Sequence, residues 1–461
     1  MQRVAGSFRD PSGFVYESSG NLFRAISSSY KEEFEALMAS GLYVKLLKES
    51  RVAPFEETSS DIDGVWKTIR PEQIPFISYP YEWSFGQLKD AALATLDIQL
   101  DALEHGMSLK DASAYNIQFL HGRPVLIDHL SFERLEEGKP WSAYRQFVMH
   151  FLGPLALMAK ADTRHSLQLR NYIDGLPLDY ISKSLPKTTW LSPAIFIHIH
   201  LHAALQKKYS DTSTTDIKHA REKIRAKSVS FATLKNLINS LKAATEALNL
   251  PSLDTEWGNY YEDTNYTRTA FAFKKEAVNR IAARFRPKRA CDLGANDGEF
   301  SRILANHAGF VISADIDPLA VHKNYQRSRS NNEPLLMPVL EDLCNPSPAL
   351  GWANEERSSF LERARCDFVM GLALIHHLCI GNNVPLSLVA KLFRSLSPVA
   401  LIEFVPKEDS QVKRLLSARE DIFDDYSLEN CIRAFCAYYA SVERIEIPES
   451  PRTLLLLSEK V

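Results

Sequence analysis

Short apolar runs separated by stretches of helical spacing dominate the second half of the chain. The apolar runs fall at residues 290–293, 311–314, 335–340, 365–373 and 399–402. Runs of this length bounded by turn residues are typical of buried strands, and their alternation with helices predicts a parallel sheet with helices on both faces. Residues 438–447 and 453–457 predict a closing pair of strands, one of them antiparallel.

The first half has a mixed pattern. Residues 8–30 alternate polar and apolar positions around turn residues, which predicts a β-hairpin. Helical spacing follows over residues 30–50, then a strand region that contains prolines, then an amphipathic helix over 85–103. Residues 141–250 predict further helices, strongest over 141–158 and 231–248.

These patterns predict two domains. Residues 1–250 are expected to form an α+β, largely helical domain, and residues 251–461 an α/β, Rossmann-like domain. The segment 251–266 is rich in tyrosine as well as turn formers, and it is interpreted as the linker into the second domain.

Composition and charge exclude several classes of protein. The chain has 461 residues, of which 45% are hydrophobic and 24% charged, and its formal net charge is −3. This balance is that of an ordinary soluble protein and gives no global basic field for nucleic acid or anionic membranes. No apolar run reaches the length of a transmembrane helix, and the N-terminus has no apolar core of signal-peptide length, so a cytoplasmic location without a transmembrane segment is expected.

Neither the cysteines nor the histidines predict a metal site. All six cysteines follow residue 290 without a C-x-x-C pair, which favours buried thiols over disulfides or a zinc site. His198 and His202 would share one helix face, but no acidic residue neighbours them, so a structural pair is favoured over zinc.

A glycine-bearing turn lies between the first strand and first helix of the second domain. It reads Asp292-Leu-Gly294-Ala-Asn-Asp-Gly298. The glycines allow a sharp turn and close approach of a ligand, and the helix start offers free N–H groups. It is not the dinucleotide pattern G-x-G-x-x-G. About 20 residues later the next strand ends in Asp315, where an acid can accept hydrogen bonds from ribose hydroxyls. Together they predict a site for a nucleoside-bearing ligand.

The turn resembles the first motif of class I S-adenosylmethionine (SAM) methyltransferases, D/E-x-G-x-x-x-G. The resemblance implies a SAM site formed by Asp292, Gly294, Ala295, Asn296, Gly298, Asp315, Ile316 and Gly371. It also implies that an acid after the third strand, Asp342 rather than Glu341, accepts a hydrogen bond from the adenine amine. Tyr266 is expected to help cover the cofactor, together with Tyr261 and Asn265; alternatively, these residues pack the domain joint.

The fourth strand is followed by neither N/D-P-P-Y/F nor a Pro-Cys nucleophile. Its end is Leu372-Ala-Leu-Ile-His376-His377. Histidine titrates near neutral pH, so His376 or His377 is the expected base for an oxygen acceptor, with Glu403 as second candidate. The alternative is that the histidines pack or cap a helix and that Glu403 forms a salt bridge or a cap.

Three stretches look like the nodulation protein NoeA group of methyltransferase-like proteins. They are Ala373-Leu-Ile-His-His-Leu, Leu401-Ile-Glu-Phe-Val-Pro-Lys-Glu-Asp and Asn265-Tyr266. The resemblance implies a bacterial methyltransferase whose acceptor is a glycan, lipid or polyketide-like metabolite.

Residues 109–128 resemble the catalytic loop of kinase-like and aminoglycoside-phosphotransferase-like folds. Asp111 and Asn116 match D-x-x-x-x-N, and Asp128 matches the metal-binding Asp after the next hairpin. Leu109-Lys110 precede Asp111 where the family has His-Arg or His-Gly, His129 replaces the usual Gly, and the V-A-I-K strand is missing. The alternative is that Asp111 and Asn116 cap turns and Asp128 closes a strand.

The sequence therefore predicts a SAM-dependent methyltransferase whose N-terminal domain recognises an unidentified small-molecule, glycan or lipid-like acceptor. A SAM-binding regulatory scaffold without turnover is one alternative. A bifunctional protein with an ATP-using N-terminal half is the other.

Overall fold

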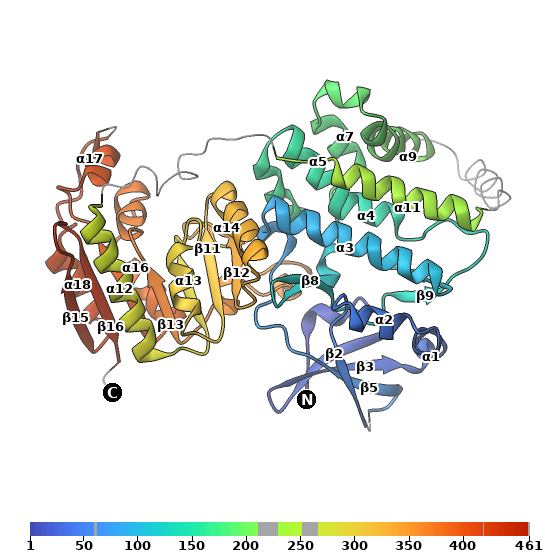
Figure 1. Ribbon diagram of the computed structural model, residues 1–461, viewed down its shortest axis with the longest axis horizontal. Helices are drawn as coiled ribbons and strands as arrows, with labels where there is room; N and C mark the ends of the chain where they lie inside the picture. Colours follow the sequence, from blue (N-terminus) through green and yellow to red (C-terminus); the bar gives the residue numbers. More distant parts are fainter. Residues whose placement is uncertain (60–61, 211–228, 251–265, 418, 460–461) are drawn as a thin grey trace. The chain divides into compact units, whose positions relative to one another are not determined.

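The computed structural model describes residues 1–59, 62–210, 229–250, 266–417 and 419–459 (Figure 1). They separate into two compact units. Unit 1 comprises Met1–Ser252 and Leu350–Arg357, and unit 2 comprises Leu253–Ala349 and Ser358–Val461. The division into domains 1–250 and 251–461 stays a prediction, because spatial grouping does not show that either part folds alone.

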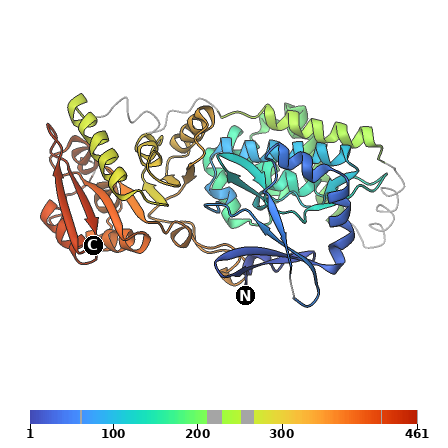
Figure 2. The same cartoon turned by 60° about the horizontal axis from the view of Figure 1, so that its bottom comes forward.

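Unit 1 begins with a five-stranded antiparallel sheet, drawn in blue in Figure 2. Its strands, in sheet order, are β1 (Gln2–Arg3), β2 (Gly13–Ser18), β3 (Asn21–Ser27), β5 (Val65–Pro71) and β4 (Phe55–Thr58). The prediction of one helix over 30–50 is wrong, because α1 (Lys31–Ala39) and α2 (Leu42–Lys48) are separate helices. Gly41 stands between them with φ 79°, a left-handed conformation that glycine adopts without steric cost and that ends a helix.

The rest of unit 1 is mainly helical. The helix predicted over 85–103 is α3 (Phe85–Glu104), which Ser84 and Gln87 cap reciprocally and against which α11 (Phe231–Glu246) packs. The other α-helices among the described residues of unit 1 are α4 (Tyr144–Phe147), α5 (Gly153–Lys160), α6 (Gln168–Asn171), α7 (Leu178–Ser184), α8 (Pro193–Ile195) and α9 (His202–Ser210). Two π-helical segments join them, η5 (Val148–Leu152) and η8 (Phe196–Leu201). The short strands are β6 (Met107–Leu109), β7 (Ile117–Leu120), β8 (Arg123–Leu126) and β9 (Phe132–Arg134).

The segment Leu350–Arg357 belongs to unit 1 although it lies late in the sequence. Glu356 is buried and accepts a 3.0 Å hydrogen bond from Arg9 Nε, and the Arg357 guanidinium lies 4.4 Å from the centre of the Tyr115 ring. Unit 1 therefore contains a piece contributed by the second half of the chain.

Unit 2 is built on a seven-stranded sheet of order β12-β11-β10-β13-β14-β16-β15. The strands are β10 (Ala290–Leu293), β11 (Val311–Asp315), β12 (Leu336–Leu340), β13 (Phe368–Gly371), β14 (Val399–Phe404), β15 (Ser441–Glu446) and β16 (Thr453–Ser458). The strands from β12 to β14 run parallel, and β16 pairs antiparallel with both β14 and β15. This order is that of class I methyltransferases, so the predicted Rossmann-like fold is confirmed.

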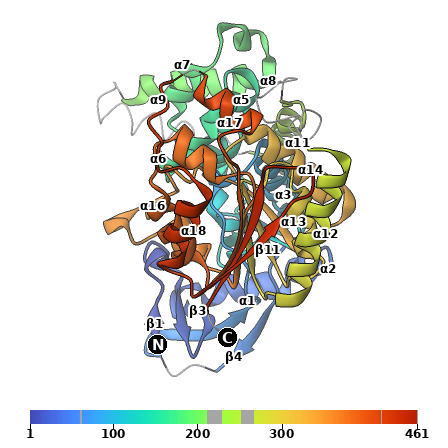
Figure 3. The ribbon, with the colours of Figure 1, turned by 90° about the vertical axis from the view of Figure 1, so that its left-hand side faces the viewer.

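Helices cover both faces of this sheet, as Figure 3 shows. On one face lie α12 (Arg268–Phe285), α13 (Glu299–Ala305) and α14 (Pro318–Asn331). On the other lie α16 (Leu386–Leu396) and α18 (Leu428–Cys436); α15 (Phe360–Arg363) and α17 (Ser410–Leu416) are short additions. Every residue of β10, β11, β12 and β13 is buried, as expected for parallel strands covered on both faces. The carboxyl ends of these four strands therefore meet at one edge, where ligands bind in such sheets.

Two details complete the fold. Cys291, Cys379 and Cys431 are buried as expected, but Cys344 and Cys436 are exposed, so the expectation of buried thiols is wrong for these two. Within the described ranges, no helix combines the length and the apolar composition that crossing a bilayer requires.

Candidate functional site

The glycine-bearing turn after β10 has the backbone geometry that the sequence predicts. Gly294 and Gly298 have φ of 73° and 80°, in the left-handed region that favours glycine. The N–H groups of Gly294 and Ala295 both donate to the Ala314 carbonyl of the neighbouring strand, at 2.9 and 3.0 Å. These bonds fix the turn against β11 and bring it to the edge of the sheet.

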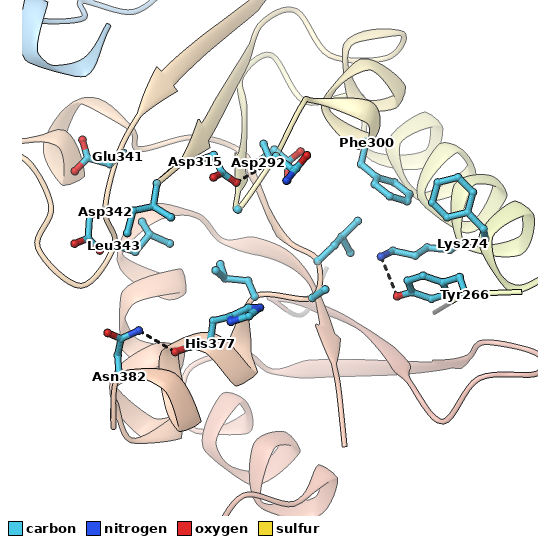
Figure 4. Close-up of a pocket in the computed structure, with 18 residues that line it drawn as sticks. Tyr266, Lys274, Asp292, Phe300, Asp315, Glu341, Asp342, Leu343, His377 and Asn382 are labelled. Atoms are coloured by element: carbon cyan, nitrogen blue, oxygen red, sulfur yellow. Dashed lines mark hydrogen bonds between the residues drawn. The ribbon is translucent and has the colours of Figure 1, made fainter. Parts of the chain in front are cut away.

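A pocket of about 280 Å³ opens at this edge (Figure 4). Its walls come from the ends of β10, β11, β12 and β13 and from α12 and α13. The lining residues are Tyr266, Phe271, Lys274, Asp292, Gly294, Ala295, Asn296, Phe300, Asp315, Ile316, Glu341, Asp342, Leu343, Leu372, Ala373, Leu374, His377 and Asn382. The structure thus brings together most of the predicted cofactor residues, from Tyr266 to Asp342.

Two predicted cofactor residues, Gly298 and Gly371, do not line the pocket. A Cβ atom at Gly298 would lie 2.4 Å from the Asn324 side chain, and one at Gly371 would lie 2.6 Å from the Phe393 ring. Both glycines are therefore required by close packing behind the pocket. Tyr261 and Asn265 lie outside the described residues.

Asp315 is fixed at the end of β11. One carboxylate oxygen accepts from the Asn296 N–H at 2.7 Å and the other from the Asp317 N–H at 2.8 Å. Burial raises the pKa of Asp315 to about 6 despite these bonds. Each carboxylate oxygen has two lone pairs, so acceptor capacity for ribose hydroxyls remains.

The two acids after β12 have different surroundings. Glu341 is buried and accepts from the Ser347 N–H at 2.6 Å and from the Ser347 hydroxyl at 2.9 Å, so its carboxylate holds the following loop. Asp342 is half-buried and accepts from the Cys344 N–H through one oxygen, at 2.8 Å. Of the two, Asp342 is better placed to accept from an adenine amine.

Asp292 is the most strongly perturbed acid in the pocket. It is 2% exposed and accepts a 2.6 Å hydrogen bond from the Ser301 hydroxyl. Burial raises the pKa of Asp292 to about 7, and the nearby Asp315 adds to the shift. A buried carboxylate with one donor is electrostatically suited to a cationic ligand group.

The two histidines after β13 differ in position. His377 lines the pocket, whereas His376 is 1% exposed behind it, and their ring centres are 4.1 Å apart. Burial lowers the pKa of His377 to about 4, so its imidazole is uncharged at neutral pH. Of the pair, only His377 has the position to contact a ligand.

Glu403 does not line the pocket. It is fully buried at the end of β14 and makes an ion pair of 2.6 Å with the Lys274 ammonium. Although burial alone would raise the pKa of Glu403, Lys274 and Arg452 hold it below its ordinary value. The structure therefore gives Glu403 the salt-bridge role that the sequence leaves open as an alternative.

Sequence reasoning misses Lys274, whose side chain is 4% exposed although it lies on an amphipathic helix. The pattern of α12 contains no signal for this, because its partner Glu403 lies on a strand far along the sequence. Ala373, which also lines the pocket, has φ 48°, a rare conformation for a residue with a side chain that often marks functional sites.

Comparison with known proteins gives the family. No model of a known protein family matches the chain. The chain is 36% identical over 458 residues to the nodulation protein NoeA of Rhizobium meliloti (strain 1021), with 98% of this chain and 95% of that protein covered. The chain belongs to the NoeA family. With the strand order and the pocket, the C-terminal unit of this NoeA-family chain is a class I SAM-dependent methyltransferase domain.

Three solved structures are similar to parts of this NoeA-family chain. The N-methyltransferase NodS from Bradyrhizobium japonicum WM9 has a TM-score of 0.32 at 12% identity, over 42% of this chain and 98% of NodS. The magnesium protoporphyrin IX methyltransferase ChlM from Synechocystis PCC 6803 has a TM-score of 0.30 at 18% identity, over 43% and 91%. The bifunctional kinase-methyltransferase WbdD has a TM-score of 0.28 at 18% identity, over 42% of this chain and 40% of WbdD. The fold assignment rests on the strand order of the chain itself and not on these likenesses.

The phosphotransferase-like motif of this NoeA-family chain falls in unit 1. Asn116 donates to the Ser131 hydroxyl at 3.2 Å, and that hydroxyl donates to Asp128 at 2.6 Å. Asp111 accepts from the Ser113 N–H at 2.9 Å, and it lies close enough to Asp128 for the two charges to interact. The three predicted residues are thus neighbours around the ends of β6, β7 and β8.

A cation missed by the sequence reading completes this cluster. Arg24 on β3 contacts Asp128 at 2.6 Å and Asp10 at 2.6 Å. A guanidinium therefore already neutralises the carboxylate that would bind a metal ion in a phosphotransferase.

One histidine of the predicted pair in unit 1, His198, has both ring nitrogens engaged. His198 bonds through Nδ1 to the Tyr144 hydroxyl at 2.8 Å and through Nε2 to the Ser240 hydroxyl at 2.9 Å. Among the residues that the structure describes, no group of three or more histidine, cysteine, aspartate or glutamate side chains is arranged to hold a metal ion.

Proposed function

We propose that this NoeA-family chain transfers the methyl group of SAM to an oxygen atom of a small-molecule, glycan or lipid-like acceptor. We also propose that its N-terminal part recognises that acceptor. The observation that carries the proposal is the row of acids in one pocket: Figure 4 shows Asp342, Asp315 and Asp292 following one another along the strand ends. Their order matches a ligand with an amine, a ribose and an ammonium in succession.

The residues of the pocket fit SAM in this order. Asp342 would accept a hydrogen bond from the adenine amine, and Asp315 would accept hydrogen bonds from the ribose hydroxyls. Asp292 would accept a hydrogen bond from the ammonium of the amino-acid end. When bound, SAM supplies a methyl group on a positively charged sulfur, which an acceptor oxygen displaces in line. The pocket residues bind and orient the reactants and exclude water, which accounts for much of the acceleration of such transfers.

His377 is the proposed base that removes the proton of the acceptor hydroxyl. It begins the π-helical turn that follows β13 and lines the pocket with an uncharged imidazole. A hydroxyl must lose its proton as its oxygen forms the new bond, and an imidazole within hydrogen-bond reach can take it. A pKa near 4 makes the free imidazole a weak base, so the negative charge that develops on the acceptor oxygen as it loses its proton would have to raise that pKa.

Calorimetry on the full chain tests the cofactor part of the proposal. We expect SAM and S-adenosylhomocysteine to bind, and Asp315→Ala to weaken both by about tenfold or more, because it removes one charge-assisted acceptor. Asp111→Asn, in unit 1, is the matched control and is expected to leave both affinities unchanged. Absence of binding to the wild-type chain would refute the assignment of the pocket.

Transfer itself is tested with methyl-labelled SAM in a cell lysate. Label in an oxygen-linked methyl group, reduced at least tenfold by His377→Ala with unchanged S-adenosylhomocysteine affinity, is the expected outcome. Cofactor binding without any labelled product would instead favour the SAM-binding scaffold.

A second candidate function is nucleotide use by unit 1. It is favoured by the proximity of Asp111, Asn116 and Asp128, the residue types that position an acceptor hydroxyl and magnesium in phosphotransferases. Magnesium-dependent ATP binding by the full chain, abolished by Asp128→Asn, is the test. Binding of ATP that does not depend on magnesium or on Asp128 would exclude this function.

A further inference from the structure

We propose that Lys274 binds the carboxylate of the amino-acid end of SAM and, with Asp292, recognises that end as a zwitterion. The inference rests on the proposed function of the pocket and names the residues that select the amino-acid part of its ligand. Lys274 lines the pocket from α12, and Figure 4 shows it with Tyr266 at the end away from Asp342 and Leu343.

The order of charges along the pocket matches the order of groups in the ligand. From the Asp342 end, Asp315, Asp292 and Lys274 follow in turn (Figure 4). Asp292 and Lys274 are close enough for their charges to interact. A carboxylate next to an ammonium in a buried site complements an α-amino acid, whose own ammonium and carboxylate are joined through one carbon.

The Lys274 ammonium has a donor to spare. An ammonium carries three N–H donors. Two hydrogen bonds from Lys274 Nζ are found among the described residues, to Glu403 Oε2 at 2.6 Å and to the Tyr266 hydroxyl at 3.1 Å. The third donor is therefore available to a ligand oxygen without breaking the ion pair.

A buried network holds the ammonium in place. Arg452 donates to Tyr266 at 2.8 Å and makes a two-bond ion pair with Asp409, at 2.7 and 3.1 Å. Tyr266 in turn donates to Glu403. Two cations and two anions, all almost fully buried, are thus linked in one charge-balanced set, and three of them contact the Tyr266 hydroxyl.

This network makes its other members positioning residues. The Tyr266 hydroxyl donates to Glu403 and accepts from both Lys274 and Arg452. The Lys274 ammonium also lies 4.6 Å from the centre of the Phe300 ring, which restricts it further. Lys274 is the member that combines the pocket wall with an uncommitted donor.

The test compares three ligands that differ only at the amino-acid end. S-Adenosylhomocysteine carries both groups, its decarboxylated analogue carries only the ammonium, and 5′-methylthioadenosine carries neither. For the wild-type full chain, we expect loss of the carboxylate to weaken binding by about 10- to 100-fold, the usual range for a charged hydrogen bond.

Lys274→Met should weaken the binding of S-adenosylhomocysteine by a similar factor and leave the affinity for 5′-methylthioadenosine unchanged. Lys275→Met is the matched control, because the neighbouring lysine pairs with Glu299 and does not line the pocket. If Lys274→Met does not fold, the double variant Lys274→Met with Glu403→Gln is used, because the second substitution removes the buried anion that would otherwise be unpaired. The comparison of the three ligands on the wild-type chain tests the inference without any variant.

Equal affinity of the wild-type chain for S-adenosylhomocysteine and its decarboxylated analogue would overturn the inference. An equal loss of affinity for all three ligands in Lys274→Met would also overturn it, because it would indicate that the lysine is structural. Failure of the wild-type chain to bind any of the three would refute the proposed function instead.

Discussion

The affinity of the pocket for S-adenosylhomocysteine should depend on pH through Asp292. Burial raises the pKa of this carboxyl to about 7 in the free protein. The ligand ammonium pairs with the carboxylate form, so protonation of Asp292 competes with binding. With a pKa of 7 the ionised fraction is roughly nine-tenths at pH 8 and roughly one-tenth at pH 6.

Affinity scales with the competent fraction, so protonation of Asp292 alone should lower it about tenfold between pH 8 and pH 6, and Asp315, with a pKa of about 6, should add about a further twofold. Calorimetry at pH 6, 7 and 8, in buffers of different ionisation enthalpy, measures both the affinity and the proton released on binding. Near pH 7 we expect net proton release, because the bound ammonium lowers the pKa of Asp292.

The control ligand is 5′-methylthioadenosine, which has no ammonium. Its affinity depends on Asp315, with a pKa of about 6, so it should change by about twofold over the same range. Asp292→Asn should reduce the pH dependence of the affinity for S-adenosylhomocysteine to that of the control ligand. A flat wild-type profile, or the same slope for both ligands, would refute the placement of the ammonium at Asp292.

Three further predictions concern stability. Because the folded pKa of Asp292 exceeds its unfolded value, the native state binds more protons between about pH 4 and 7 and loses stability as pH rises; Asp292→Asn should therefore raise Tm more at pH 8 than at pH 5. Gly298→Ala should lower the free energy of unfolding, measured by urea denaturation, by about 1–3 kcal/mol, because φ at this position is 80° and the added Cβ would clash. The control Gly381→Ala, which has open space around it, should change the free energy of unfolding by less than about 0.5 kcal/mol. Arg24→Met should lower the free energy of unfolding by about 3–5 kcal/mol, because it leaves the Asp128 carboxylate without its cation. Adding Asp128→Asn should restore part of this loss of stability. If the second substitution restores nothing, Arg24 stabilises the fold by packing alone.

The site features that the sequence predicts are local in the chain. The turn from Asp292 to Gly298 encodes its own geometry, because Gly294, Asn296 and Gly298 have positive φ and glycine and asparagine adopt such values most readily. Asp315 follows from the rule that strand ends of a parallel sheet share an edge. Short-range chemistry and one topological rule therefore suffice for the cofactor edge.

The features that it misses depend on distant partners. Lys274 is buried because its ion-pair partner Glu403 comes to it from β14, far along the sequence. The same holds for Arg24, whose partner Asp128 follows β8. Which of two adjacent histidines lines the pocket depends on the local helix phase, and a π-helical turn begins at His377. No pattern within one element carries this information.

The eight residues Leu350–Arg357 have a practical consequence for any attempt to separate the two halves. A truncation after residue 250 deletes the acid that Arg9 contacts and the guanidinium that stacks on Tyr115. During synthesis, the first unit likewise stays incomplete until more than three quarters of the polypeptide has left the ribosome. The N-terminal half is thus a poor candidate for independent expression, and it depends for completion on sequence that encodes its neighbour.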